Sequence, residues 1–261
     1  MKRSKITILL AIVLGMTFHS CLDLEPQDQL GGKNMWTSVN DYKQFANTFY
    51  SWTRDFSSVV YDGTHSDKRS DLITYQSYNE FSRGINSIPS SDANYTDNYK
   101  HIRRTNLLLQ NAEAYAKPED IKQYIGEAYF FRAYSYFDLL QLYGDVIITK
   151  KPLDITDPEM KVKRNDRSEV VDLIIDDLNH AVENLPAFKE LTTEEEGRIS
   201  KEGAQAFLSR VALYEGTWEK YVPSIGYDLD GDGTNSGAGT AKPEGYPSVT
   251  ELLTLAKTMS K

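Results

Sequence analysis

Residues 118–144 read PEDIKQYIGEAYFFRAYSYFDLLQLYG and decide the fold class. Pro118 suits the first position of a helix, because the N–H that proline lacks would stay unpaired there, and Gly144 suits the stop. The stretch carries many aromatic side chains at helical spacing: Tyr124, Tyr129, Phe130, Phe131, Tyr134, Tyr136 and Phe137. A helix that is apolar around its girth must be covered on several sides. The stretch therefore predicts a central helix whose aromatic residues form core.

Three other parts of the chain have the pattern of long amphipathic helices. Apolar residues recur at helical spacing over 96–112, 166–186 and 200–221. Asp166 with Glu169 three residues later is typical of a capping box at the start of the second of these helices. With the central helix, these patterns predict four long helices in two antiparallel pairs.

Shorter elements complete the prediction. We expect a short helix within 36–52, a final helix over 248–256 and one brief extended segment at 146–148, with no convincing sheet. Small residues flanked by aromatic residues suit the close packing of stacked helical hairpins. The sequence therefore predicts an all-α fold, a tetratricopeptide-like helical repeat with long irregular loops.

The first 20 residues have the pattern of a secretory signal peptide. Lys2, Arg3 and Lys5 precede an apolar run over 6–16, which is shorter than the roughly 20 residues that span a bilayer. Cys21 is the only cysteine, so it has no internal disulfide partner. Its position resembles a bacterial lipobox, which predicts lipidation of Cys21, a tether over 21–33 and a folded domain over 34–261. The alternative is a free cysteine beside an ordinary cleavage site.

The charge balance excludes some classes of partner. The chain has 29 basic and 38 acidic residues, and the signal peptide holds three of the basic ones and no acidic one. A surface this acidic repels nucleic acid and anionic headgroups, so we expect no nucleic-acid partner and membrane attachment through the lipid alone. Asp23 and Glu25 resemble the surface-export signal of Bacteroidetes lipoproteins; a plain acidic tether is the alternative.

The polar segment from about 56 to 97 holds the candidate ligand site. Sugar binding uses aromatic faces and planar polar groups, and binding residues favour loops on a rigid scaffold. Tyr75 and Tyr78 are the first candidates, with Asn79, Asp67 and Arg69 as polar partners; Tyr61, Phe81, Tyr95 and Asp71 belong to the same set. The alternative is that these tyrosines pack the loop onto the helices.

A possible calcium loop follows the last long helix. Asp228, Asp230 and Asp232 take the first, third and fifth positions of such a loop, before a glycine at the turn. Gly239 stands where a bidentate carboxylate is expected, so an acidic surface turn is the alternative. No other cofactor is predicted.

Catalytic patterns are missing from the sequence. We find no zinc-protease, phosphate-loop or nucleophile-elbow motif, and the pair Asp176 and Asp177 is predicted to lie on the solvent-exposed side of its helix. A glycoside hydrolase fragment would need two carboxylates roughly 5–9.5 Å apart across a cleft.

Five motifs in order give the chain its resemblance to the SusD/RagB family of Bacteroidetes outer-membrane lipoproteins. They are CLDLEP at 21–26, IRRTN at 102–106, GEAYFFRAY at 126–134, the stretch 164–186 and GRISK at 197–201. The resemblance implies a surface protein that binds glycan nutrients beside a SusC-type TonB-dependent transporter in the outer membrane, and that is not an enzyme. Family members are roughly twice this long, so we expect this chain to correspond to the N-terminal helical portion. The rival interpretation is a helical-repeat scaffold that contacts proteins only.

Overall fold

A computed structural model describes residues 35–53, 85, 87–222 and 242–261. Its α-helices are α2 (Val39–Asn47), α5 (Ala93–Glu113), α6 (Lys122–Tyr143), α7 (Arg167–Asn184), α8 (Lys201–Tyr221) and α9 (Val249–Met259). Short 3₁₀ turns are η1 (Thr48–Trp52), η3 (Pro118–Ile121), η4 (Pro158–Lys161), η5 (Phe188–Glu190) and η6 (Thr193–Glu195).

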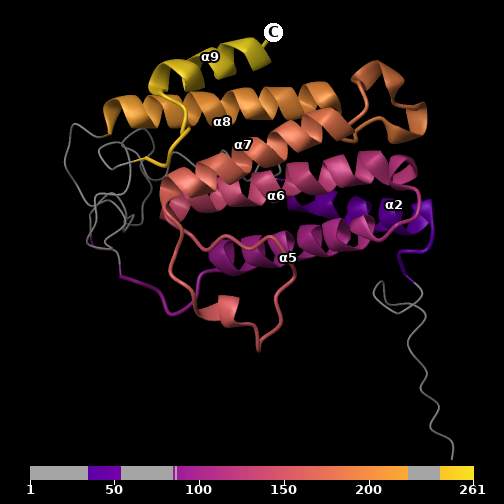
Figure 1. The fold of residues 1–261 in the computed structure, drawn as a ribbon, viewed down its shortest axis with the longest axis horizontal. Coiled ribbons are helices and arrows are strands. Elements are labelled where there is room, and N and C mark those ends of the chain that lie inside the picture. The colour runs from indigo at the N-terminus through magenta and orange to yellow at the C-terminus, as the bar shows by residue number, and fades with distance from the viewer. Residues whose placement is uncertain (1–34, 54–84, 86, 223–241) are drawn as a thin grey trace, which may run out of the picture.

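The long helices stack side by side in chain order, from α5 through α6, α7 and α8 to α9 (Figure 1). Helix α2 lies beside α6 and α5 at the N-terminal end of the stack. Among the described residues, extended pairing is limited to one antiparallel bridge between Val146 and Asn165. The all-α, tetratricopeptide-like prediction is confirmed, and its four long helices are α5 to α8.

The helix boundaries follow local capping chemistry. The side chains of Asp166 and Glu169 form the expected capping box of α7, and Ser200 caps α8 by accepting from the Gly203 N–H at 3.2 Å. Helix α5 begins three residues earlier than the predicted Thr96, because the Asp92 side chain caps it. The proline-led start at 118 is a 3₁₀ turn that continues into α6.

The core is centred on α6. Phe130, Phe131, Tyr136 and Phe137 of α6 are buried, as their spacing predicts. The Phe130 and Phe137 rings contact the Phe207 ring of α8, with centroids 5.4 and 5.6 Å apart. The Phe131 ring contacts the Phe49 ring with centroids 5.7 Å apart, which joins η1 to the stack. Aromatic contacts of this kind add to the gain from burial.

One prediction about α7 is wrong. Asp176 is exposed as expected, but Asp177 is fully buried and forms an ion pair with Arg132 of α6, with nitrogen to oxygen distances of 2.6 and 2.8 Å. Neighbouring residues on a helix point about 100° apart, so one can face solvent while the next faces α6. Asp177 is therefore part of the helix interface and not a solvated acid.

Candidate functional site

Most of the predicted site residues lie outside the part of the chain that the structure describes. These are the lipidation candidate Cys21, the loop residues Tyr61, Asp67, Arg69, Asp71, Tyr75, Tyr78, Asn79 and Phe81, and the calcium candidates Asp228, Asp230 and Asp232. Tyr95 is described, and its assignment to a loop is wrong. It stands in the first turn of α5, half-buried, with its ring 4.7 Å from that of Tyr99 and 5.3 Å from that of Tyr143.

A small pocket of about 180 Å³ lies where η1, α5 and α6 meet, and we call it the Trp52 pocket. Its lining combines aromatic rings with amide and carboxyl groups: Trp52, Ala93, Asn94, Asp97, Asn98, His101, Tyr134 and Asp138. Trp52 stands two residues before the segment 54–84 in which sequence analysis predicts the glycan-binding tyrosines. The pocket thus includes a residue that is adjacent in sequence to that predicted loop.

Aromatic stacking fixes the geometry of the Trp52 pocket. The Trp52 indole stacks on the His101 imidazole, with centroids 4.1 Å apart and planes 15° apart. Trp52 is held from behind by the rings of Phe49 and Phe131 at 4.8 and 5.9 Å. The indole is therefore positioned by the core and is half-exposed at the pocket.

The charges of the pocket follow from burial and hydrogen bonding. Burial lowers the pKa of His101, so its imidazole is neutral at neutral pH and stacks without a charge. A hydrogen bond from the Lys100 ammonium at 2.7 Å lowers the pKa of Asp97, which keeps this carboxylate ionised. A half-exposed indole beside a carboxylate and two amides can contact a sugar ring and bond its hydroxyls.

Sequence reasoning missed this pocket, although one signal was present. Asn94, Asp97, Asn98 and His101 follow one another at intervals of three, one and three residues, which places them on a single face of α5. That polar face of an otherwise core-packed helix indicates an exposed or ligand-facing surface. The contribution of Trp52 could not be read from sequence, because it stands 42 or more residues before this face.

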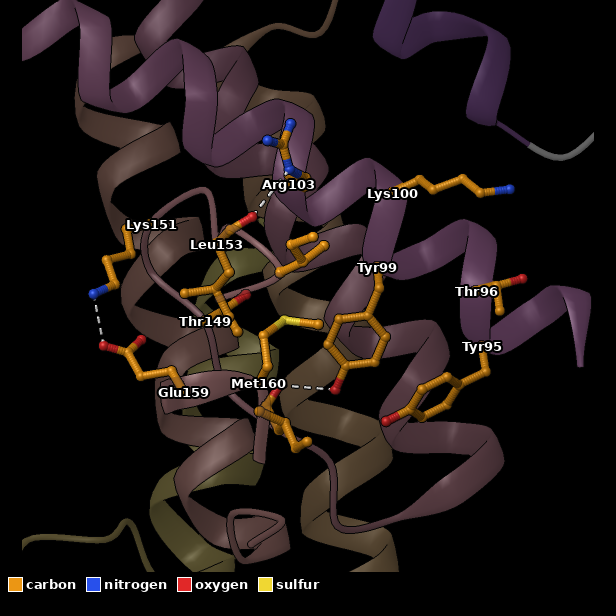
Figure 2. A pocket seen from close by; sticks show the side chains of 12 residues that line it. Tyr95, Thr96, Tyr99, Lys100, Arg103, Thr149, Lys151, Leu153, Glu159 and Met160 are labelled. Carbon is orange, nitrogen blue, oxygen red and sulfur yellow. Dashed lines mark hydrogen bonds and ion pairs between the residues drawn. The ribbon is translucent and has the colours of Figure 1, made fainter. Parts of the chain in front are cut away.

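A second and larger hollow of about 520 Å³ runs between the N-terminal half of α5 and the connection from α6 to α7; we call it the Tyr99 groove (Figure 2). Its lining is mostly apolar and includes Tyr95, Tyr99, Ile147, Leu153, Ile155 and Met160. Lys100, Arg103, Lys151 and Glu159 stand around it. The two hollows lie on different faces of the same turns of α5, and one is polar whereas the other is mostly apolar.

The described residues include neither a metal-binding cluster nor a membrane-spanning helix. No group of three or more His, Cys, Asp or Glu side chains there is arranged to hold a metal ion. No described helix has the length and apolar character that crossing a membrane requires. The calcium prediction concerns residues outside this part of the chain, so it stays a prediction.

The stacked helical hairpins define a helical-repeat protein of the tetratricopeptide type. The chain belongs to the SusD-like family, whose sequence model is described as starch-binding and associating with the outer membrane and matches residues 22–213. The family resemblance predicted from the five motifs is confirmed.

Individual relatives agree with this family. Two SusD-like proteins of Formosa agariphila, P38 and P2, are 27% and 28% identical to the chain over 238 and 237 residues. The matches cover 84% of this chain in both cases but 44% and 45% of the relatives, so the chain spans less than half of their length. A solved SusD-like protein of Bacteroides fragilis matches with a TM-score of 0.60 and 27% identity, over 77% of this chain and 40% of that one.

Proposed function

We propose that the chain acts at the bacterial surface as a lipid-anchored glycan-binding protein of nutrient uptake, beside a SusC-type TonB-dependent transporter, and that it is not an enzyme. The family description as starch-binding and outer-membrane-associated supports the ligand class and the location. The Trp52 pocket carries the proposal, because an indole, amides and a carboxylate line one hollow there.

The proposed fit rests on two chemical features of a sugar. A pyranose ring has a C–H face that packs on an aromatic plane and hydroxyls that need planar polar partners. The half-exposed part of Trp52 supplies apolar aromatic surface, and Asp97 and Asn94 of α5 supply acceptors and donors at its side. We further propose that Tyr75 and Tyr78, with Asn79, Asp67 and Arg69, complete the site, and that any calcium binds at Asp228, Asp230 and Asp232.

Glycan binding is tested by calorimetry with maltoheptaose and a panel of other oligosaccharides. We expect Trp52→Ala and Asp97→Ala to weaken binding by about tenfold or more, which corresponds to roughly 1.4 kcal/mol. Asp97 is exposed, so its replacement leaves the core intact and separates binding from folding. Tyr221→Ala is the matched control, since this aromatic residue is 61% exposed on α8, away from the pocket.

The outcomes separate the proposal from its rivals. Saccharide affinity that survives both pocket substitutions would place the site elsewhere. No affinity for any saccharide would favour the protein-contact scaffold, and release of reducing sugar would favour a hydrolase.

The lipid anchor is tested by cell fractionation. Cys21→Ala removes the only thiol that can carry the lipid, so we expect the protein to move from the membrane to the soluble fraction. Ser20→Ala is the control, because it keeps both the thiol and a small residue at the cleavage position. A Cys21→Ala protein that stays in the membrane would contradict the anchor.

A further inference from the structure

Exposed apolar side chains gather beside the Tyr99 groove. Ile155 is 88% exposed, Met160 50% and Val162 45%, and all three belong to the connection between α6 and α7. Ile155 and Met160 also line the groove, and Figure 2 shows Met160 there. A contiguous apolar patch at the surface typically marks an interaction site, and methionine adapts easily to a partner's shape.

The polar groups of the groove are already used within the protein. The Tyr99 hydroxyl donates to the Ile147 carbonyl at 2.8 Å, and burial raises the pKa of Tyr99, so this proton stays in place. The Arg103 Nε–H donates to the Leu153 carbonyl at 3.4 Å. The Lys151 ammonium pairs with Glu159 at 2.7 Å. The floor therefore offers few free partners for sugar hydroxyls, and it favours an apolar occupant.

The charge around the groove differs from that of the whole chain. The lining of the groove holds three basic side chains and one acidic side chain, whereas the chain has 29 basic and 38 acidic ones. The connection over 150–164, which lines one side of the groove, has five basic and three acidic side chains. Lys161, Lys163 and Arg164 are all exposed. Charge complementarity therefore favours an occupant that carries carboxylates next to its apolar groups.

The shape of the groove selects among occupants of that chemistry. A hollow of about 520 Å³ between a helix and a connection is filled by side chains that project from a segment, whereas a flat lipid surface would leave it empty. We propose that the Tyr99 groove docks a protein partner through a segment whose apolar side chains are flanked by Asp or Glu. This docking surface is distinct from the Trp52 pocket and does not depend on glycan capture.

The proposal is tested by site-specific photo-crosslinking of the full chain in the cells that make it. A photoreactive phenylalanine analogue replaces Ile155 or Met160, and the control position is Leu213, which is 52% exposed on α8. We expect adducts at 155 and 160 to one protein, mapped by mass spectrometry to a segment with apolar residues flanked by acidic ones. We expect no such adduct at 213.

Charge reversal provides the second arm. Lys163→Glu with Arg164→Glu is expected to lower the adduct yield about fivefold, while Lys220→Glu on α8 leaves it unchanged. Adducts to lipid, to glycan or to a second copy of this chain would overturn the proposal, and so would a mapped segment without acidic residues or the lack of any adduct. Loss of maltoheptaose binding in the Trp52 variants has no bearing on this result, so the two proposals fail separately.

Discussion

Three buried ion pairs tie neighbouring elements together at the residue scale. Arg132 joins Asp177 between α6 and α7, Arg167 joins Glu215 between α7 and α8 at 2.6 Å, and Arg198 joins Glu127 of α6 at 2.7 Å. Desolvation offsets much of the attraction within such a pair, so its presence does not imply a large gain in stability. Each pair can form in only one register of the two elements. Its main effect is therefore to favour the native packing over other packings.

The Arg132 pair extends into a longer network. The second terminal nitrogen of the Arg132 guanidinium donates to the Asn106 side chain at 2.8 Å, and the Asn106 amide donates to the Thr149 carbonyl at 2.9 Å. The chain of contacts thus links α7, α6 and α5 to the connection that lines the Tyr99 groove. All of its side chains are satisfied, as buried polar groups require.

Two adjacent carboxylates of α7 give a matched test of this network. Asp177→Ala leaves the buried Arg132 without its counter-charge and is expected to cost about 3–5 kcal/mol of unfolding free energy. Asp176→Ala, at an exposed position, is expected to change it by no more than about 0.5 kcal/mol. Urea unfolding followed by circular dichroism measures both. Equal losses in the two variants would show that the Asp177–Arg132 pair does not exist in solution.

The sequence shows the residues of these ion pairs but does not show which residues pair with each other. Asn106, Glu127, Arg132 and Arg198 all stand in the motifs that carry the family resemblance. The partners Arg132 and Asp177 are 45 residues apart, and Arg198 and Glu127 are 71 apart. Helical periodicity fixes which residues share a face but not which face of another helix they meet. For that reason the exposure of Asp176 was predicted correctly and that of Asp177 was not.

At the scale of elements, caps and glycines explain where helices begin and how closely they pack. The helix starts at Asp166, Ser200 and Ser248 could be predicted because capping is a local interaction. Close packing is not local. Gly126 of α6 lies against the end of α7, and a Cβ atom at that position would stand 2.9 Å from Leu185 Cγ and 3.1 Å from Asn184 Cβ.

The space around Gly126 and Gly203 predicts opposite effects on stability when each is replaced by alanine. Gly126→Ala is expected to destabilise by about 1–3 kcal/mol, because the added methyl group pushes α7 away from α6. Gly203→Ala on α8 is expected to stabilise by about 0.5–1 kcal/mol. A Cβ atom there meets nothing closer than 3.8 Å, and alanine loses less conformational entropy than glycine when the helix forms. Thermal unfolding compares them. Stabilisation by Gly126→Ala would mean that the two helices are further apart than described.

The Trp52 pocket shows why a site is harder to predict than an element. Its lining residues come from η1, α5 and α6, so the stack must form before they meet. The polar face of α5 could be recognised from spacing, but its proximity to Trp52 and Tyr134 depends on how three elements pack. Sequence reasoning therefore predicted a site in the segment before α5, which stays a prediction, and did not identify the pocket.

At the scale of the whole molecule, the stack in Figure 1 is nearly one-dimensional. Helix α6 packs against α5, α7 and α2, whereas α9 packs mainly against α8 at the C-terminal end of the stack. In stacked helical proteins stability is approximately the sum of unit and neighbour terms, so terminal elements open at a lower free energy than central ones. We therefore expect backbone amide exchange to be fastest in α9 and slowest in α6.

One substitution at the α8–α9 contact tests this organisation. A Cβ atom at Gly216 would stand 3.0 Å from Leu253 Cδ2 and 3.2 Å from Leu252 Cβ, so Gly216→Ala pushes α9 away from α8. Hydrogen exchange measured by mass spectrometry is expected to rise in α9 and to stay unchanged in α6. Gly203→Ala, on the same helix but without a close neighbour, is the control and should leave α9 unaffected. An equal rise across all helices would instead show that the stack opens as one cooperative unit, because the loss of one terminal contact would then raise exchange at the opposite end as well.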